Sequence, residues 1–308
     1  MKPLFPAGWN WVWVVRFLVL LPLISSWRFW GKGGLGYGVV FLSPFEGVER
    51  SIGSGEPIGG FVIIFRIIYF LVVGLVWLGT NEKQIRIGGF GFVTLVVCAF
   101  IGCSGMFGNA TLLAVVIVGL LCFSPKMQDI SISWQLAVMY LLTGITKLLE
   151  PEWRNGIYGL NHLTRSHFEI TNEVAALVFG WFIIIAELLF AVCLIVLPWV
   201  GWSIRYVIVL CIVLFHCFSS TIGPGNFSPF VYAIAVPAIA LVADFAVSKR
   251  MVSSWLVLFA VGAVVSGRQL GFEFGYRFLL PALIVVLFAL VFMARYSKGY
   301  SPDRIDCN

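Results

Sequence analysis

The chain has 308 residues, of which 60% are hydrophobic and 11% are charged, and its formal net charge is +6. A soluble domain carries about 25% charged residues, so this composition excludes a water-soluble protein and makes the lipid bilayer the expected solvent. The apolar runs are long and continuous, which favours membrane-spanning helices over a β-barrel, whose strands alternate over short segments. The positive charge fits the basic loops of membrane proteins and gives no sign of nucleic-acid binding.

A helix needs about 20 apolar residues to cross the hydrocarbon core of a bilayer. By this measure the sequence predicts an all-α, polytopic transmembrane bundle of about ten spans, and of about eight at the least. The expected spans are residues 9–27, 58–79, 87–104, 108–124, 133–149, 173–199, 203–221, 227–246, 253–267 and 277–295. No repeat and no polar linker divides them, so residues 1–308 are expected to form a single membrane domain. The first span holds Arg16 and lacks a cleavage site of small residues, so we do not expect a removable signal peptide.

Basic residues predict the orientation of the spans, because cytoplasmic loops carry the excess of lysine and arginine. The short loops on the side of both termini hold more of these residues than the long loops on the other side. We therefore expect both termini in the cytoplasm and the loops 28–57 and 150–172 outside. Loop 150–172 has apolar and aromatic residues at roughly helical spacing, which predicts a short amphipathic helix on the membrane surface.

Lys147 stands at the outer end of the fifth expected span, two helical turns after Tyr140, so the two residues share one face. Gly144 lies between them and allows another helix or a ligand to approach closely. A lysine in an apolar site favours its neutral form and can serve as a base. The alternative is a lysine whose amine extends to the membrane interface, and position alone favours this alternative.

Glu187 lies near the middle of the sixth expected span, where a carboxylate cannot reach water. We expect it to be protonated, or paired with Arg16 or Arg66, or bonded to the imidazole of His216. It is either a polar clasp between helices or part of a proton relay or ligand site. His216 lies in the outer half of the seventh span, where a histidine is more often a satisfied hydrogen-bonding residue than a catalyst. The two arginines are expected to bind acidic groups or the carbonyl groups at helix C-termini.

The cysteines and histidines form no metal signature. The chain has 7 cysteines, and most of them fall within apolar runs without CxxC or zinc spacing, so we expect buried hydrophobic residues. His162 and His167 are spaced poorly for one helix face, and we predict no metal site. The sequence also lacks a Walker A loop, a GxSxG elbow and an HExxH motif.

The segment YLLTGITKLLEPEWRNG, residues 140–156, resembles the signature of the HTTM family, the membrane domain shared with vitamin K-dependent gamma-glutamyl carboxylases. The matching positions are Tyr140, Gly144, Lys147, Leu148, Trp153 and Gly156. In a second similar stretch, Glu187 stands where the family has an acidic residue, and Arg205 follows it. The run FHCFSSTIGPGNFSPF then carries His216 and Phe227 in the family's arrangement of a histidine before Gly-x-Phe.

The resemblance, which extends from Arg16 to about residue 245, implies a reaction. In the carboxylases a lysine at the position of Lys147 is regarded as the base toward vitamin K hydroquinone. Oxygenation of the quinol yields a strong base that deprotonates a glutamyl side chain, and carbon dioxide is then added. By this resemblance Lys147, His216 and Glu187 are expected to be catalytic, and a reduced, vitamin K-like quinone is the expected cofactor. The residues expected to line the substrate pocket are Tyr140, Gly144, Trp153, Gly156, Asn109, Arg205 and Phe227.

Two features depart from the carboxylase pattern. The carboxylases have a histidine in an Asn-Asn-His segment after the third span, whereas GMFGNATLL keeps Asn109 and has Ala110 in that place. The aspartate that related bacterial members often have near there is absent as well. The carboxylases also continue into a large soluble domain, whereas this sequence stops soon after its last expected span. The resemblance therefore implies that full glutamyl carboxylation needs a partner subunit.

The sequence leaves more than one class of function open. The first is a membrane enzyme that acts on a quinol-like or other lipid-soluble substrate with Lys147 as base. The second is a partner-dependent component in the maturation or export of an antimicrobial peptide toxin, as in stand-alone HTTM members of the sporulation-delaying-protein B type. That class would have a small protein partner and a peptide substrate. A transporter is the weakest, because no inverted repeat is visible. We expect a bacterial cytoplasmic membrane, with the active face outside.

Overall fold

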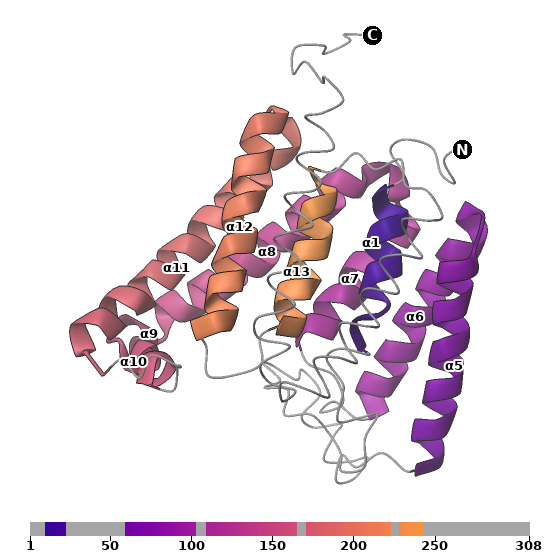
Figure 1. The fold of residues 1–308 in the computed structure, drawn as a ribbon, viewed down its shortest axis with the longest axis horizontal. Helices are drawn as coiled ribbons and strands as arrows, with labels where there is room; N and C mark the ends of the chain where they lie inside the picture. Colours follow the sequence, from indigo (N-terminus) through magenta and orange to yellow (C-terminus); the bar gives the residue numbers. More distant parts are fainter. Residues whose placement is uncertain (1–9, 23–58, 103–108, 165–170, 223–227, 243–308) are drawn as a thin grey trace, which may run out of the picture. The chain divides into compact units, whose positions relative to one another are not determined.

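A computed structural model describes residues 10–22, 59–102, 109–164, 171–222 and 228–242 of the chain (Figure 1). These residues form helices and turns, and no strand occurs among them, so the predicted all-α class is confirmed for this part of the chain. Within the described ranges, three helical segments are long and apolar enough to cross a membrane: Pro125–Leu149, Glu173–Trp199 and Trp202–Ser219. Shorter apolar helices cover Ile64–Leu78, Ala110–Phe123 and Phe230–Ala240.

The helices follow the expected spans, with differences at the ends. In every expected span from 9–27 to 227–246 the described residues form a helix. The first of these helices covers only Asn10–Leu18 before a turn, so the structure does not confirm a full span there. The expected spans 253–267 and 277–295 and the expected loop 28–57 lie outside the described residues. The total number of spans therefore stays a prediction.

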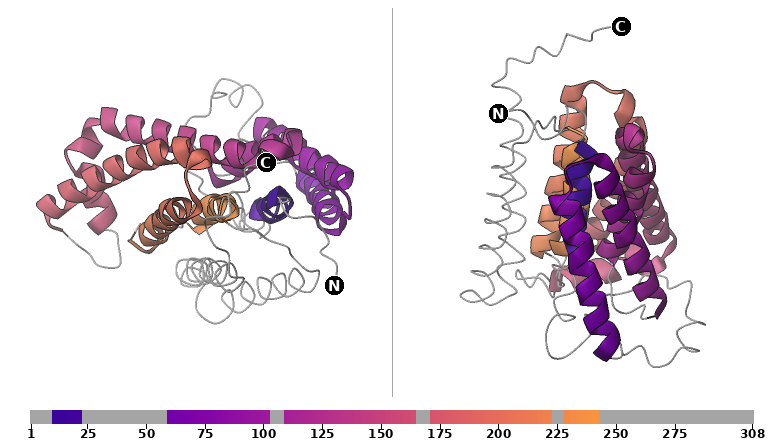
Figure 2. Two further views of the ribbon diagram at one scale, coloured as in Figure 1. Left: turned by 90° about the horizontal axis from the view of Figure 1, so that it is seen from above. Right: turned by 90° about the vertical axis from the view of Figure 1, so that its right-hand side faces the viewer.

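The chain divides into two compact units, and residues Leu4–Gln128 form the first of them. Its helices are α1 (Asn10–Leu18), α5 (Gly59–Leu78), α6 (Glu82–Gly102) and α7 (Asn109–Phe123), followed by the 3₁₀ turn η2 (Pro125–Met127). Helices α5 and α6 lie side by side (Figures 1 and 2), and α6 packs in turn against α7. The turn between α5 and α6 is fixed by Asn81, whose side chain accepts a hydrogen bond from the backbone N–H of Gln84 at 2.9 Å.

The buried Arg16 ties α1 to the C-terminal end of α5. Its guanidinium donates to the carbonyl oxygens of Val76 at 3.2 Å and Gly79 at 2.8 Å. It also lies over the ring of Trp77, 5.9 Å from the centroid. The last carbonyl groups of a helix lack partners within it and carry partial negative charge, so a cation satisfies them. The prediction that Arg16 binds carbonyl groups at a helix C-terminus is therefore confirmed.

The second unit consists of residues Asp129–Asn308 together with Met1–Pro3. Its helices are α8 (Gln128–Leu149), α9 (Pro151–Arg154), α10 (Ile157–Thr164), α11 (Glu173–Val196), the 3₁₀ turn η3 (Leu197–Trp199), α12 (Trp202–Ile222) and α13 (Ser228–Ala240). Proline begins α9, where its missing N–H is harmless. Asn172 caps α11 by accepting from the backbone N–H of Ala175 at 2.9 Å. Pro151 and Asn172 therefore mark where α9 and α11 begin.

Helices α8, α9 and α10 run along α11 in the opposite direction. The contacting pairs, in order along α8 to α10, are Ser133 with Leu194, Tyr140 with Phe190, Gly144 with Leu188, Lys147 with Glu187, Gly156 with Leu177 and Gly159 with Ala176. Along this list the residue numbers rise in α8 to α10 and fall in α11. The contacts are antiparallel and reach over residues 176–194 of α11, but the 14 residues from Ser133 to Lys147 lie opposite only the 7 from Leu194 to Glu187. Helix α8 therefore crosses α11 at an angle.

Glycines let this packing become close. A Cβ atom at Gly180 of α11 would stand 2.8 Å from the carbonyl oxygen of Trp153 in α9. Gly156 has φ +78°, a left-handed conformation that suits glycine, and lies against the backbone of Leu177. In the expected amphipathic segment 150–172, the described residues 150–164 consequently form two short helices, α9 and α10, broken at this glycine.

We predict that Gly180→Ala lowers the stability of the protein by about 1–3 kcal/mol, the usual effect of overpacking. The added methyl group meets backbone in α9, which cannot rotate away as a side chain can. Thermal unfolding in detergent micelles measures the effect. The matched control is Gly74→Ala in α5, where a Cβ atom meets nothing within 4 Å. Equal melting temperatures for the two variants would contradict the close contact between α9 and α11.

We predict that Arg16→Met lowers stability by about 1–3 kcal/mol, because the carbonyl groups of Val76 and Gly79 lose a donor in an apolar region. Arg16→Lys keeps the charge but not the forked geometry, and its loss is expected to be smaller. The same unfolding measurement compares both variants with the unaltered protein. A methionine variant as stable as the lysine variant would show that hydrogen bonding to these carbonyl groups contributes nothing.

Candidate functional site

The side chains of Lys147 and Glu187 form an ion pair between α8 and α11. The ammonium nitrogen of Lys147 lies 2.8 Å and 2.7 Å from the two carboxylate oxygens of Glu187. The side chains of Lys147 and Glu187 are 18% and 10% exposed. Both residues therefore have their charge neutralised by a partner, as a charge inside a bilayer requires.

The surroundings of Lys147 hold its side chain in place. Gly144 lies one turn earlier on α8 and lets the backbone of Leu188 in α11 come close. The indole ring of Trp153 in α9 lies over the ammonium group, 5.3 Å from its nitrogen, a cation–π arrangement. The ring of Trp153 in turn contacts the rings of Tyr158 and His162 of α10, with centroids 5.3 Å and 5.9 Å away. Lys147 thus has a carboxylate on one side and an aromatic ring on another.

A second polar pair joins α8 to α12. The hydroxyl group of Tyr140 lies 2.5 Å from Nε2 of His216, and both side chains are buried. Tyr140 and Lys147 are two turns apart on α8 and share one face, about 10 Å apart along the helix axis. The two pairs are therefore neighbours on α8, and each reaches a different helix.

Aromatic rings surround the Tyr140–His216 pair. The ring of His216 meets the rings of Phe215 and Phe230 edge to face, with centroids 5.2 Å and 5.7 Å away. Phe190 of α11 packs against Tyr140, with ring centroids 5.6 Å apart. An environment of rings is poor in hydrogen-bonding groups, so the bond between the phenol and the imidazole is electrostatically strong there.

The partner of Glu187 differs from those that the sequence suggested. Protonation, an arginine partner or a bond to His216 was expected, whereas the carboxylate binds Lys147. Lys147 likewise turns to Glu187 instead of extending along the helix end to water. Within the expected spans, Lys147 is the only lysine and Glu187 is the acidic residue nearest to a span centre. Their pairing could have been predicted from this complementarity.

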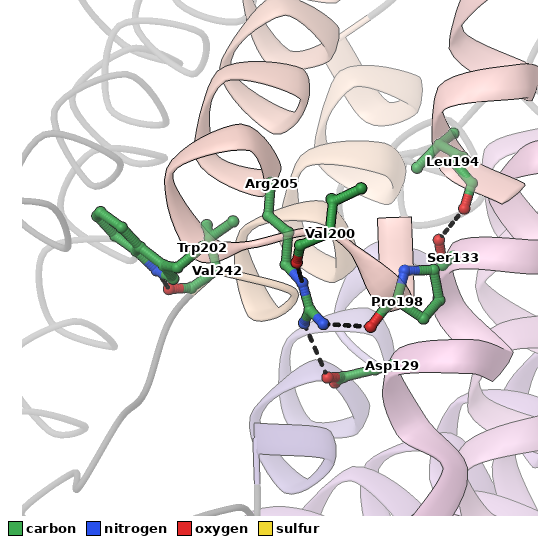
Figure 3. Close-up of polar contacts among 8 residues, drawn as sticks. All are labelled: Asp129, Ser133, Leu194, Pro198, Val200, Trp202, Arg205 and Val242. Carbon is green, nitrogen blue, oxygen red and sulfur yellow. Dashed lines mark hydrogen bonds and ion pairs between the residues drawn. The ribbon is translucent and has the colours of Figure 1, made fainter. Parts of the chain in front are cut away.

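Arg205 does not lie with these residues. It is near the start of α12, eleven residues before His216, which corresponds to about 16 Å along a helix. Its guanidinium donates to the carbonyl oxygens of Val200 at 2.9 Å and of Pro198, and lies 3.4 Å from the carboxylate of Asp129 at the start of α8 (Figure 3). The same figure shows the hydroxyl of Ser133 bonded to the carbonyl oxygen of Leu194. Arg205 therefore closes the turn between α11 and α12.

The remaining predicted pocket residues have different outcomes. Trp153, Gly144 and Tyr140 lie at the two polar pairs, and Gly156 contacts α11 close to Trp153. Asn109 begins α7 in the other compact unit, and Phe227 lies outside the described residues. A functional role for each residue stays a prediction.

The two pairs can hold and move protons. Lys147, Glu187, Tyr140 and His216 each carry an exchangeable proton in one of their states, and each is hydrogen-bonded to another member of the set. Among the described residues, no group of three histidine, cysteine, aspartate or glutamate side chains is arranged to hold a metal ion. The arrangement suits acid–base chemistry in a site with little water.

Comparisons with family models, with curated proteins and with solved structures find no match to this chain.

Proposed function

We propose that this chain is a polytopic membrane enzyme of the HTTM type that acts on a quinol-like or other lipid-soluble substrate, with Lys147 as base. The observation that supports the proposal is the partly buried Lys147–Glu187 pair beneath the ring of Trp153. Lysine and tryptophan both belong to the segment that resembles the family signature. A lysine held by a carboxylate between two helices apolar enough to cross a membrane is more than an interfacial anchor.

The pair must rearrange before Lys147 can act as a base, because a bound ammonium has no lone pair to offer. Lys147 first passes a proton to Glu187 along the 2.7 Å hydrogen bond, which leaves a neutral amine and a neutral carboxylic acid. The amine then takes the proton of a quinol hydroxyl, which leaves a quinolate beside a new ammonium. In a site with little water the first step removes two charges together, so the neutral pair is accessible. Glu187 is the proton acceptor in this scheme.

Aromatic residues give the depth of the site in the membrane. Trp199 of η3 is 66% exposed and lies next to the 49%-exposed Trp134 of α8, with ring centroids 6.3 Å apart; exposed tryptophans favour the membrane interface. A hydrocarbon core of about 30 Å reaches from Trp199 along α11 to about Gly180, which contacts Trp153. Glu187 then lies about 10 Å inside the boundary marked by Trp153.

The orientation follows from the basic residues of the sequence. The Arg205 end of α12 faces the cytoplasm with both termini, and the Trp153 end of α8 and α9 faces outward. In this placement α9 and α10 lie at the outer surface of a bacterial cytoplasmic membrane. A lipid-soluble substrate reaches Lys147 from the outer leaflet, and ten spans cross the membrane, as the hydropathy of the sequence indicates.

A second function is favoured by Ala110, which is buried near the start of α7 and supplies no side chain for catalysis. In this alternative the chain is a partner-dependent component of antimicrobial peptide maturation or export, with a small protein partner, and the two polar pairs only clasp helices together. Affinity purification of the tagged chain from its native membrane distinguishes the two. The alternative requires a small protein or peptide to co-purify in stoichiometric amount, and repeated recovery of the chain alone would contradict it.

We predict that Lys147→Gln lowers quinol turnover by about 10²–10⁴-fold, the usual contribution of a general base. The test uses purified protein in lipid nanodiscs with vitamin K hydroquinone, and oxygen consumption is the measurement. Lys83→Gln is the matched control, because Lys83 is an exposed lysine on α6. Turnover that is equal in the unaltered protein and both variants would remove the enzymatic proposal.

Exchange of the two charges separates catalysis from stability. The double variant Lys147→Glu/Glu187→Lys keeps an ion pair between α8 and α11 but moves the amine to the other helix. If the pair is only a clasp, this variant retains both the melting temperature and all other properties of the protein. If Lys147 is the base, the variant keeps much of its stability and loses turnover, because the amine no longer lies in its required position.

A further inference from the structure

The hydrogen bond between Tyr140 and His216 leaves the location of one proton open. Either the phenol donates to Nε2 or the imidazole Nε2–H donates to the phenol oxygen, and the separation of the two atoms does not distinguish these assignments. A neutral imidazole carries one proton, so the choice determines which nitrogen remains available for another partner. The acid and base strengths of the two groups decide between the two assignments.

The phenol must be the donor. Among the described residues, the hydroxyl of Tyr140 has His216 as its hydrogen-bond partner and no other acceptor. Each assignment leaves one proton without an acceptor among the described residues, either the phenol proton or Nδ1–H, so acid and base strength make the choice. A phenol is a stronger acid than a neutral imidazole N–H, and an imidazole nitrogen is a stronger base than a phenol oxygen. Donation by Tyr140 satisfies the hydroxyl and makes Nε2 the acceptor.

The imidazole must also be neutral. Its ring is enclosed by the rings of Phe215, Phe230 and Tyr140, which offer no anion to a second proton. The nearby carboxylate of Glu187 already binds the ammonium of Lys147 with both oxygens. An imidazolium here would be a buried, unpaired charge, which proteins avoid.

We propose that Tyr140 is a positioning residue that fixes neutral His216 in the tautomer with its proton on Nδ1. His216 then acts as a hydrogen-bond donor through Nδ1 and not as a base. Among the described residues His216 makes its side-chain hydrogen bond through Nε2, so Nδ1 is the nitrogen that can donate to an oxygen of a bound molecule. That second step rests on the proposed function: Lys147 takes the proton of a quinol-like substrate, and His216 donates to an oxygen of the same ring.

The tautomer can be measured without any substrate. Nitrogen-15 NMR of histidine-labelled protein in nanodiscs separates protonated from unprotonated ring nitrogens and Nδ1 from Nε2. The chain has only 3 histidines, so the spectrum of His216→Gln assigns the signals of His216. We expect one protonated Nδ1 and one unprotonated Nε2 at neutral pH. If the unaltered protein instead shows an imidazolium, or a proton on Nε2, the proposal is overturned.

The variant Tyr140→Phe keeps the aromatic ring and removes the hydroxyl. We expect the signals of His216 to change to a mixture of both tautomers while those of His162 and His167 stay unchanged. Tyr206→Phe on α12 is the control and is expected to leave all signals as they were. A spectrum of Tyr140→Phe that retains the single tautomer would show that the phenol does not position His216.

A measurement of activity tests the donor role of His216 separately from its tautomer. If the protein turns over vitamin K hydroquinone, Tyr140→Phe is expected to lower kcat about tenfold, the effect of one hydrogen bond, and to leave KM nearly unchanged. Unchanged kcat, with the expected NMR spectrum, would overturn the donor role while the tautomer stands. If the unaltered protein shows no turnover at all, the proposed function and the donor role fail together, and the NMR spectrum still decides the tautomer.

Discussion

The ion pair between Lys147 and Glu187 restricts how α8 can lie against α11. A charge at this depth is stable only beside its opposite, so the two helices must be adjacent and must bring these residues to the same level. A shift of one helical turn would separate the partners by about 5 Å along the axis. The same arrangement of α8 on α11 also places Ser133 beside a carbonyl group near the end of α11 and Gly144 against Leu188. Several weak contacts therefore agree with one strong electrostatic requirement.

The sequence predicts the helices of this chain well because runs of about 20 apolar residues mark where a helix crosses the membrane. The shared face of Tyr140 and Lys147 could likewise be predicted, since it needs only the helical period. The neighbour of each helix and the direction in which each face points are set by tertiary packing, about which hydropathy is silent. For this reason the bond between Tyr140 and His216 became visible only in the structure, whereas complementary charge was a signal in the sequence for the pairing of Lys147 with Glu187. Arg205 was grouped with the site by resemblance, although its number alone places it about three turns from His216.

Segment 150–172 shows a second limit of the sequence. Its apolar spacing predicted one amphipathic helix, whereas Gly156 adopts a left-handed conformation and divides it into α9 and α10. The break has a physical reason, because only a residue without a side chain fits so close to the backbone of Leu177. The resulting turn keeps Trp153 over Lys147. A local signal, the glycine, thus mattered more than the periodicity around it.

The chemistry of the partners separates the polar groups of this protein into two kinds. Arg16 binds backbone carbonyl groups and Arg205 binds mainly the same kind of acceptor. Backbone carbonyls do not titrate, so such contacts can join helices but cannot pass protons. In the pairs Lys147–Glu187 and Tyr140–His216, both members can gain or lose a proton. Helix joining alone would be served equally well by the first kind of contact. The occurrence of two titratable pairs, two turns apart on one face of α8, is therefore the strongest physical reason to look for proton chemistry there.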